Sequence, residues 1–193
     1  MARLRESDPA HLVFEAPIQE PDLIVWERAH GIELPVDYRT YLLELGNGGA
    51  GPFYGIWPLG LWDGAGARGS FDDAISDLSA PFPHREAWNL PADRLDPPDF
   101  EDDDEADAWQ EALDADLYEP SLMNGAFWIC DQGCALRTIL VVSGPERGTV
   151  WADLRATGGG IVPHTGSDGH HLTFGDWYLT WLEQAMRETS QTR

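Results

Sequence analysis

The clearest pattern of apolar and polar positions lies near the C-terminal end of the chain. Six apolar residues recur there at the spacing of one helix face: Phe174, Trp177, Tyr178, Trp181, Leu182 and Ala185. Thr173 immediately precedes this run, and Asp176 lies three residues after Thr173, as in a capping box. The pattern predicts an amphipathic helix that starts after Thr173 and packs its apolar stripe on a sheet or core.

Two more helices are expected near the N-terminus. In the range 21–29 a proline occupies the first turn, and Leu23 and Trp26 share one face. In the range 35–46 a proline again opens the helix and Gly46 ends it. The apolar positions between them follow i, i+3, i+4, i+7: Tyr38, Tyr41, Leu42 and Leu45.

From residue 126 onward the periodicity becomes that of strands. Apolar runs at 126–130, 135–142 and 149–153 are joined by short connections with glycine, which favour antiparallel hairpins. An earlier run, 53–57, also has the pattern of a strand. The ranges 71–78 and 106–117 are expected to be short helices, and 157–169 a loop. The order indicates an α+β fold: a mostly antiparallel sheet with N-terminal helices and a C-terminal amphipathic helix packed on one side.

The chain is strongly acidic. Its 193 residues include 34 Asp and Glu against 12 cationic residues, all arginine, for a formal net charge of −22. A field of this sign repels nucleic acid and anionic membranes and favours a basic partner. The absence of lysine excludes Schiff-base chemistry and a P-loop lysine. No apolar run reaches the roughly 18 residues of a membrane span, and no secretory leader is recognised, so we expect a cytoplasmic protein.

Much of the acid is concentrated in one segment. Residues 93–119 contain 13 Asp or Glu and a single cationic residue, Arg94. We expect one domain at 20–187 after an N-terminal extension at 1–19, with an acidic loop insertion at about 93–119.

Two sequence patterns have both a functional and a structural interpretation. Residues 46–51 match G-x-G-x-x-G, but a helix precedes them and Pro52 with a strand follows, the reverse of a dinucleotide site. The glycines are therefore interpreted as a helix end and a tight turn that requires positive φ. The acidic run 101–105 lacks the alternation and central glycine of an EF-hand and is interpreted as a solvated surface.

Metal binding and catalysis have weaker support. Cys130 and Cys134 could join downstream histidines (His164, His170 and His171) on zinc, or could face each other across a hairpin. Neither G-x-S-x-G nor H-E-x-x-H occurs. No catalytic, metal or cofactor-binding residue is predicted, and the chain is expected not to be an enzyme.

The segment 32–56 resembles the SUKH superfamily, whose best-known branch takes its name from a yeast cell-wall assembly regulator. The matching features are a helix opened by Leu34-Pro35, then Asn47-Gly48-Gly49, then Gly51-Pro52. In the C-terminal half, 148–153 and 174–182 resemble the family's strands and closing helix. The resemblance covers roughly 20–187, except for residues 60–120, and it implies an α+β fold without catalytic residues.

Bacterial members of this superfamily act as immunity proteins that bind and neutralise a cognate polymorphic toxin, often a nuclease. The resemblance therefore implies that this chain binds a cognate toxin protein, and the acidity of the chain favours a basic one. The alternatives are a regulatory or scaffold domain without a toxin, and an enzyme of unknown type. Aromatic rings beside carboxylates suit a protein-binding patch, although tryptophans in loops also pack locally. The candidate partner-binding residues are Asp99, Glu101, Asp102, Asp103, Asp104, Glu105, Trp109, Trp62 and Trp88.

Overall fold

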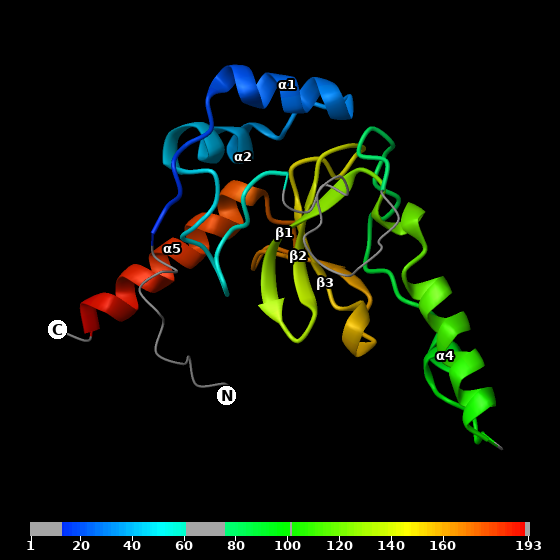
Figure 1. Cartoon of the computed structure of the whole chain (residues 1–193). Coiled ribbons are helices and arrows are strands. Elements are labelled where there is room, and N and C mark those ends of the chain that lie inside the picture. The colour runs from blue at the N-terminus through cyan, green and yellow to red at the C-terminus, as the bar shows by residue number, and fades with distance from the viewer. Residues whose placement is uncertain (1–12, 61–75, 101, 192–193) are drawn as a thin grey trace.

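The computed structural model describes residues 13–60, 76–100 and 102–191, and these residues form the α+β fold that the sequence predicts (Figure 1). The α-helices are α1 (Glu20–His30), α2 (Val36–Thr40), α3 (Ala92–Leu95), α4 (Asp103–Leu117) and α5 (Phe174–Gln191). Single helical turns are η2 (Tyr41–Leu45, a π-turn), η3 (Pro120–Met123) and η4 (Arg155–Thr157). The strands are β1 (Ala126–Gly133), β2 (Leu136–Val141), β3 (Val150–Asp153) and β4 (Ile161–Pro163). Within the described residues they form an antiparallel sheet in the order β1-β2-β3-β4.

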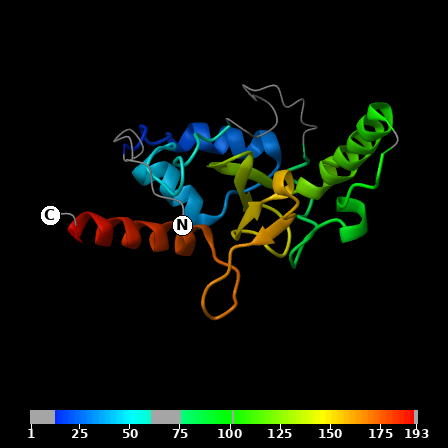
Figure 2. The ribbon, with the colours of Figure 1, turned by 90° about the horizontal axis from the view of Figure 1, so that it is seen from below.

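Both faces of this sheet are buried. One set of strand side chains packs against α1, α2 and α5: Phe127, Ile129, Leu140 and Val150. The alternate set packs against the chain at 82–88 and against η3: Ala126, Ile139, Val141 and Trp151. Figure 2 shows α1, α2 and α5 on one side of the molecule and α4 on the other. Because successive side chains of a strand point to opposite faces, the apolar run 139–142 supplies both cores.

An aromatic cluster joins α5 to the N-terminal helices. The ring centroid of Phe174 lies 4.9 Å from that of Tyr38, and the ring of Tyr178 lies 5.2 Å from that of Tyr41. Asp176 N donates to Thr173 Oγ1 at 3.2 Å, which confirms the predicted cap of α5. The apolar stripe of α5 therefore ties the C-terminal end of the chain to its beginning.

The glycine turn, residues 46–51, follows η2 and is hydrogen-bonded to the segment 13–16. Glu15 N donates to Gly48 O, Asn47 N donates to Ala16 O, and each donor lies 3.2 Å from its acceptor. The backbone φ angles of Gly48 and Gly49 are 104° and 100°, which confirms the predicted tight turn. The segment assigned to an extension thus contacts the domain from residue 13 onward.

Two elements differ from the sequence-based expectation. The strand predicted at 53–57 is instead a turn at Pro52–Gly55 followed by single bridges from Ile56 to Gly49 and Cys130. The range 157–169, expected to be a loop, contains β4. Most of the helix predicted at 71–78 lies outside the described residues. None of the helices described is both long and apolar enough to cross a membrane.

We predict that Gly49→Ala destabilises the fold strongly. A Cβ built on Gly49 meets the carbonyl oxygen of Val13 and lies 2.8 Å from Phe14 Cα, in a backbone conformation that already strains L-residues. Strain and steric overlap together should reduce the free energy of unfolding by about 3 kcal/mol, measured by chemical denaturation. Gly158→Ala is the matched control, because its φ is also positive (73°) but a Cβ would meet nothing within 4 Å. Equal losses in the two variants would contradict the close approach.

A second prediction concerns the pH dependence of stability. Burial lowers the pKa of His164, and its Nε2 lies buried without a hydrogen-bond partner among the described residues. The unfolded chain therefore binds a proton more readily than the folded chain. The free energy of unfolding should fall as the pH drops below about 6.5 and toward the lowered pKa of the folded state. In His164→Phe this part of the pH dependence should disappear, as denaturation series at several pH values would show; an unchanged series would contradict the assignment.

Candidate protein-binding site

The acidic segment folds into an arm that projects from the body of the molecule. We define the acidic arm as residues 91–119, which include α3, the chain after it, and α4. Figures 1 and 2 both show α4 (green) pointing away from the sheet, with the preceding chain running back along it. The predicted helix at 106–117 is confirmed, and it begins three residues earlier, at Asp103.

The N-terminal end of α4 is well suited to carboxylates. Asp102 Oδ1 accepts a hydrogen bond from Glu105 N at 3.0 Å and so caps the helix. Asp103, Asp104 and Glu105 occupy the first turn, where the helix dipole favours negative charge. These acidic residues therefore stabilise the first turn of α4.

An apolar stripe on α4 faces inward. Trp109, Leu113 and Leu117 follow one another at intervals of four residues; the two leucines are buried and the tryptophan is half-buried. Phe100, on the chain that precedes α4, packs on Trp109 with 5.7 Å between ring centroids. The arm thus has a small apolar contact of its own, which fixes the orientation of α4.

Exposed carboxylates lie along the whole length of α4, most of them away from the apolar stripe. They are Asp103, Asp104, Glu105, Asp107, Glu111, Asp114 and Asp116. Arg94, the one cation in residues 93–119, forms an ion pair with Asp116. The outer face therefore retains a large excess of negative charge.

Both ends of the arm attach to one part of the body, the connection from β3 to β4. Before the arm, Trp88 and Ile161 exchange two backbone hydrogen bonds of 2.8 Å, and the Asn89 side chain donates to Gly158 O at 2.6 Å. At the other end of the arm, the Arg155 side chain binds the last turn of α4. The position of the arm therefore depends on residues 153–161.

Arg155 is buried between the sheet and the end of α4. Its Nε and Nη2 donate to the two carboxylate oxygens of Asp153 at 2.8 and 2.7 Å. Its Nη1 donates to Leu117 O at 2.9 Å, and its guanidinium lies 5.0 Å from the centroid of the Tyr118 ring. The arginine therefore satisfies one of the free carbonyl groups at the C-terminal end of α4 and places a positive charge there.

The Asp153 side chain is buried like that of Arg155, and both of its carboxylate oxygens accept hydrogen bonds. Besides Arg155, its Oδ2 accepts a hydrogen bond from Trp128 Nε1 at 3.0 Å. Side-chain exposure is 2% for Arg155 and 4% for Asp153, so the pair has lost nearly all its solvation. Such a pair is stable only while both partners and their additional hydrogen bonds are present.

The structure brings most of the predicted binding residues together on the arm. Asp99 and the carboxylates at 102–105 are exposed there, and Trp109 is half-buried against Phe100. Trp88 lies apart from the arm's outer face, since it is half-buried against the second core and paired with Ile161, which fits the interpretation of local packing. Glu101 and Trp62 lie outside the described residues.

The residues that hold the arm, Arg155 and Asp153, were not predicted. Their sequence signal is an Asp-x-Arg pattern at the end of a strand, where a bidentate contact between side chains two residues apart requires the turn of η4. Their third partner, Leu117, is 38 residues from Arg155 along the chain. Local spacing could not reveal this link.

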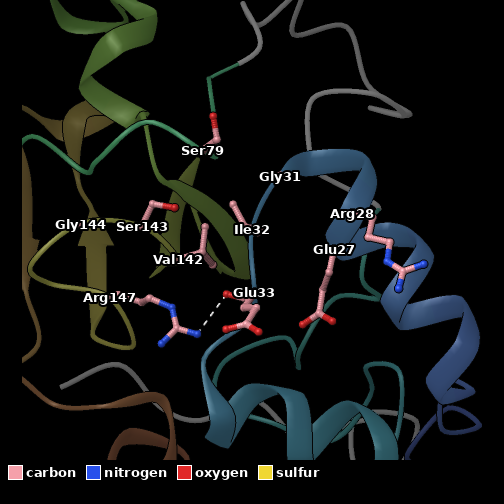
Figure 3. Close-up of a pocket in the computed structure, with 10 residues that line it drawn as sticks. All are labelled: Glu27, Arg28, Gly31, Ile32, Glu33, Ser79, Val142, Ser143, Gly144 and Arg147. Atoms are coloured by element: carbon pink, nitrogen blue, oxygen red, sulfur yellow. Dashed lines mark hydrogen bonds between the residues drawn. The ribbon is translucent and has the colours of Figure 1, made fainter.

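A groove between α1, the α1–α2 connection and the chain after β2 has a volume of about 690 Å³ and is open to solvent (Figure 3). Its polar groups bind one another. Glu27 accepts a hydrogen bond from Leu34 N at 2.9 Å, Arg147 donates to Glu33 O at 3.1 Å, and Ser143 Oγ donates to Leu78 O at 2.6 Å. These contacts hold the loops that border the groove.

The two cysteines occupy different environments. Cys130 is buried in β1, where burial raises its pKa to about 12, and its cross-strand partner is Thr138. Cys134 is exposed in the turn that follows, so the cysteines do not face each other across the hairpin. Among the described residues, no three His, Cys, Asp or Glu side chains gather as metal ligands.

We predict that Arg155→Met is strongly destabilising. The substitution leaves the Asp153 carboxylate buried without its cation and removes the donor to Leu117 O. The free energy of unfolding should fall by about 4 kcal/mol. Chemical denaturation measures this loss, and hydrogen exchange should show lower protection of the amides in α4.

Arg94→Met is the matched control, because it removes an ion pair of the same type from the surface of the arm. The side chains of Arg94 and Asp116 are each about half exposed, so this loss should be at most about 1 kcal/mol. If the two arginine variants were equally stable, Arg155 would not be the anchor of the arm.

Comparison with known proteins does not assign this chain to a family. Neither protein-family models nor curated proteins nor solved structures include a match to this chain. The resemblance of segment 32–56 and of the C-terminal half to the SUKH superfamily therefore stays a prediction that is based on the sequence motifs.

Proposed function

We propose that this chain binds a basic protein through the outer face of the acidic arm, and that it acts as an immunity protein neutralising a cognate toxin. The observation that carries the proposal is the position of the carboxylates on α4. A helix is stabilised by acidic residues at its N-terminal end only. On α4 they continue to the C-terminal end, where Asp114 and Asp116 lie close to the negative pole of the dipole.

The stability of the arm does not account for most of these charges, although Asp116 pairs with Arg94 and Asp114 accepts a hydrogen bond from Gln110. Asp103, Asp107 and Glu111 follow one another at intervals of four residues, and like charges at this spacing destabilise a helix by a few tenths of a kcal/mol per pair. Solubility does not require them either, because the rest of the chain is already acidic. A row of carboxylates on a fixed, projecting helix does suit attraction of a basic surface.

The arrangement also suits fast association. Charges on a projecting element attract an oppositely charged partner before contact, and such steering raises association rates by about 10- to 1,000-fold at low salt. A protein that grips nucleic acid carries the basic surface that such an arm would meet. Together with the resemblance to immunity proteins, this favours a nuclease toxin as the partner.

The test is to co-express this chain with the protein encoded by the adjacent gene and to measure growth and binding. The arm variant neutralises four carboxylates on the outer face: Asp103→Asn, Asp107→Asn, Glu111→Gln and Asp114→Asn. We expect the stability of the folded variant to stay close to that of the wild type, because relief of like-charge repulsion on α4 offsets the loss of one carboxylate from the first turn. The association rate should fall by about tenfold or more, and its dependence on salt should weaken.

The matched control neutralises four exposed carboxylates elsewhere: Asp22→Asn, Glu33→Gln, Glu86→Gln and Glu183→Gln. It has the same net charge as the arm variant, so an equal fall in rate would assign the effect to total charge and contradict a role for the arm. Binding without growth rescue would favour the regulatory or scaffold alternative over the immunity function.

A further inference from the structure

A second surface, remote from the arm, exposes apolar side chains around the glycine turn. Among the described residues ten large apolar side chains are exposed, and five of them converge here. We call this group the glycine-turn patch: Val13, Phe14, Leu45, Phe53 and Tyr54. Clusters of exposed apolar side chains on a protein surface commonly mark contact sites.

Backbone contacts hold the members of the patch side by side. Ala50 N donates to Val13 O at 3.2 Å, and a Cβ on Gly46, beside Leu45, would lie 3.0 Å from the Cβ of Phe14. Gly49 and Ile56 exchange two hydrogen bonds of 2.8 Å, which places the turn Pro52–Gly55 next to the glycine turn. The ring of Tyr54 lies against Gly133, at the end of the β1–β2 hairpin.

Phe53 is the residue whose conformation is hardest to explain by folding alone. Its φ is +55°, a left-handed conformation that is unfavourable for a bulky side chain, and its side chain remains about half exposed (53%). Glycine, asparagine or aspartate is the usual residue at such a turn position. Backbone strain that presents an aromatic ring to solvent, rather than burying it, is typical of sites that bind.

The charges around the patch indicate the kind of partner. The segments 13–18 and 41–60 contain two carboxylates, Glu15 and Glu44, both exposed, and no cationic residue. A second copy of the chain is disfavoured, because two molecules of net charge −22 repel each other. A basic protein is not repelled by this charge. Exposed aromatic rings often contribute much of the binding energy at protein interfaces.

We infer that the glycine-turn patch is a docking surface for a basic protein, with Phe53 as its central anchor. The inference does not depend on the acidic arm, since none of the patch residues belongs to it. In Figure 1 the turn at 52–55 (cyan) lies on the opposite side of the sheet from α4. A partner large enough to reach both surfaces would contact the chain at two separate places.

The first measurement tests whether Phe53 serves binding rather than packing. Asparagine adopts the left-handed conformation more readily than phenylalanine, so Phe53→Asn should keep or raise the midpoint of chemical denaturation. A lower midpoint would show that the ring stabilises the fold, and would overturn the inference.

The second measurement identifies what covers the patch. Three variants of the full chain each carry one photoreactive residue, p-benzoylphenylalanine. It replaces Phe53 in the patch, Ala108 on the arm, or Val25 on α1 as an exposed control. Each variant is expressed in the cells that naturally make the protein, and the cells are irradiated. We expect Phe53→p-benzoylphenylalanine, but not the Val25 variant, to cross-link to a basic protein identified by mass spectrometry. That protein, once purified, should bind Phe53→Asn at least tenfold more weakly than wild type and should bind Val25→Asn normally.

Each other outcome is decisive. A cross-link from position 53 to a second copy, to another part of the same chain, or to nothing overturns the docking surface. A cross-link to a basic protein from position 108 but not from position 53 supports binding through the arm and contradicts the docking surface at the glycine-turn patch. A product from position 53 alone retains the docking surface and removes the arm as the contact site.

Discussion

The constraint on which the rest of the molecule depends is a small sheet with both faces buried. The strands are short, from three to eight residues, and their alternate side chains enter two separate cores. Each buried aliphatic side chain contributes roughly 1.5–3 kcal/mol, so a narrow sheet of this kind needs both cores. Since helices cover one face and the chain at 82–88 with η3 covers the other, neither face is left to bind a partner. A partner of the kind proposed above would therefore have to contact segments that project from the sheet or border it.

The arm shows how an acidic surface is attached to such a body. Its outer face is rich in carboxylates, while its attachment uses one carboxylate and one guanidinium from which water is excluded. The Arg155 guanidinium binds the carbonyl group at the C-terminal end of α4, where Asp114 and Asp116 add to the negative pole of the helix. The buried charges thus fix the position of the arm, whereas the exposed charges are those to which the proposed attraction of a basic partner is assigned.

The sequence predicted those parts of the fold whose signals are local. The stripe on α5 and the apolar run at 139–142 specify their elements by periodicity alone, and the acidic helix follows from Trp109 and Leu113 at helical spacing. β4 was missed because glycines precede it and Pro163 ends it, which is the composition of a loop. The strand expected at 53–57 failed because Pro52 and Gly55 form a turn, in which Phe53 adopts a conformation its residue type disfavours. Arg155 could not be identified because its partners come together only in the folded chain.

The attachment of the arm also has a meaning for protein engineering and for divergence between related chains. Because the arm leaves the body after Asn89 and returns at Leu117, and both ends bind residues 155–161, we expect the intervening residues to form an exchangeable cassette. A different helix of similar length, ending in a carbonyl group that Arg155 can reach, would fit the same two attachment points. Specificity could then change by replacing one segment, while the sheet and its two cores stay as they are.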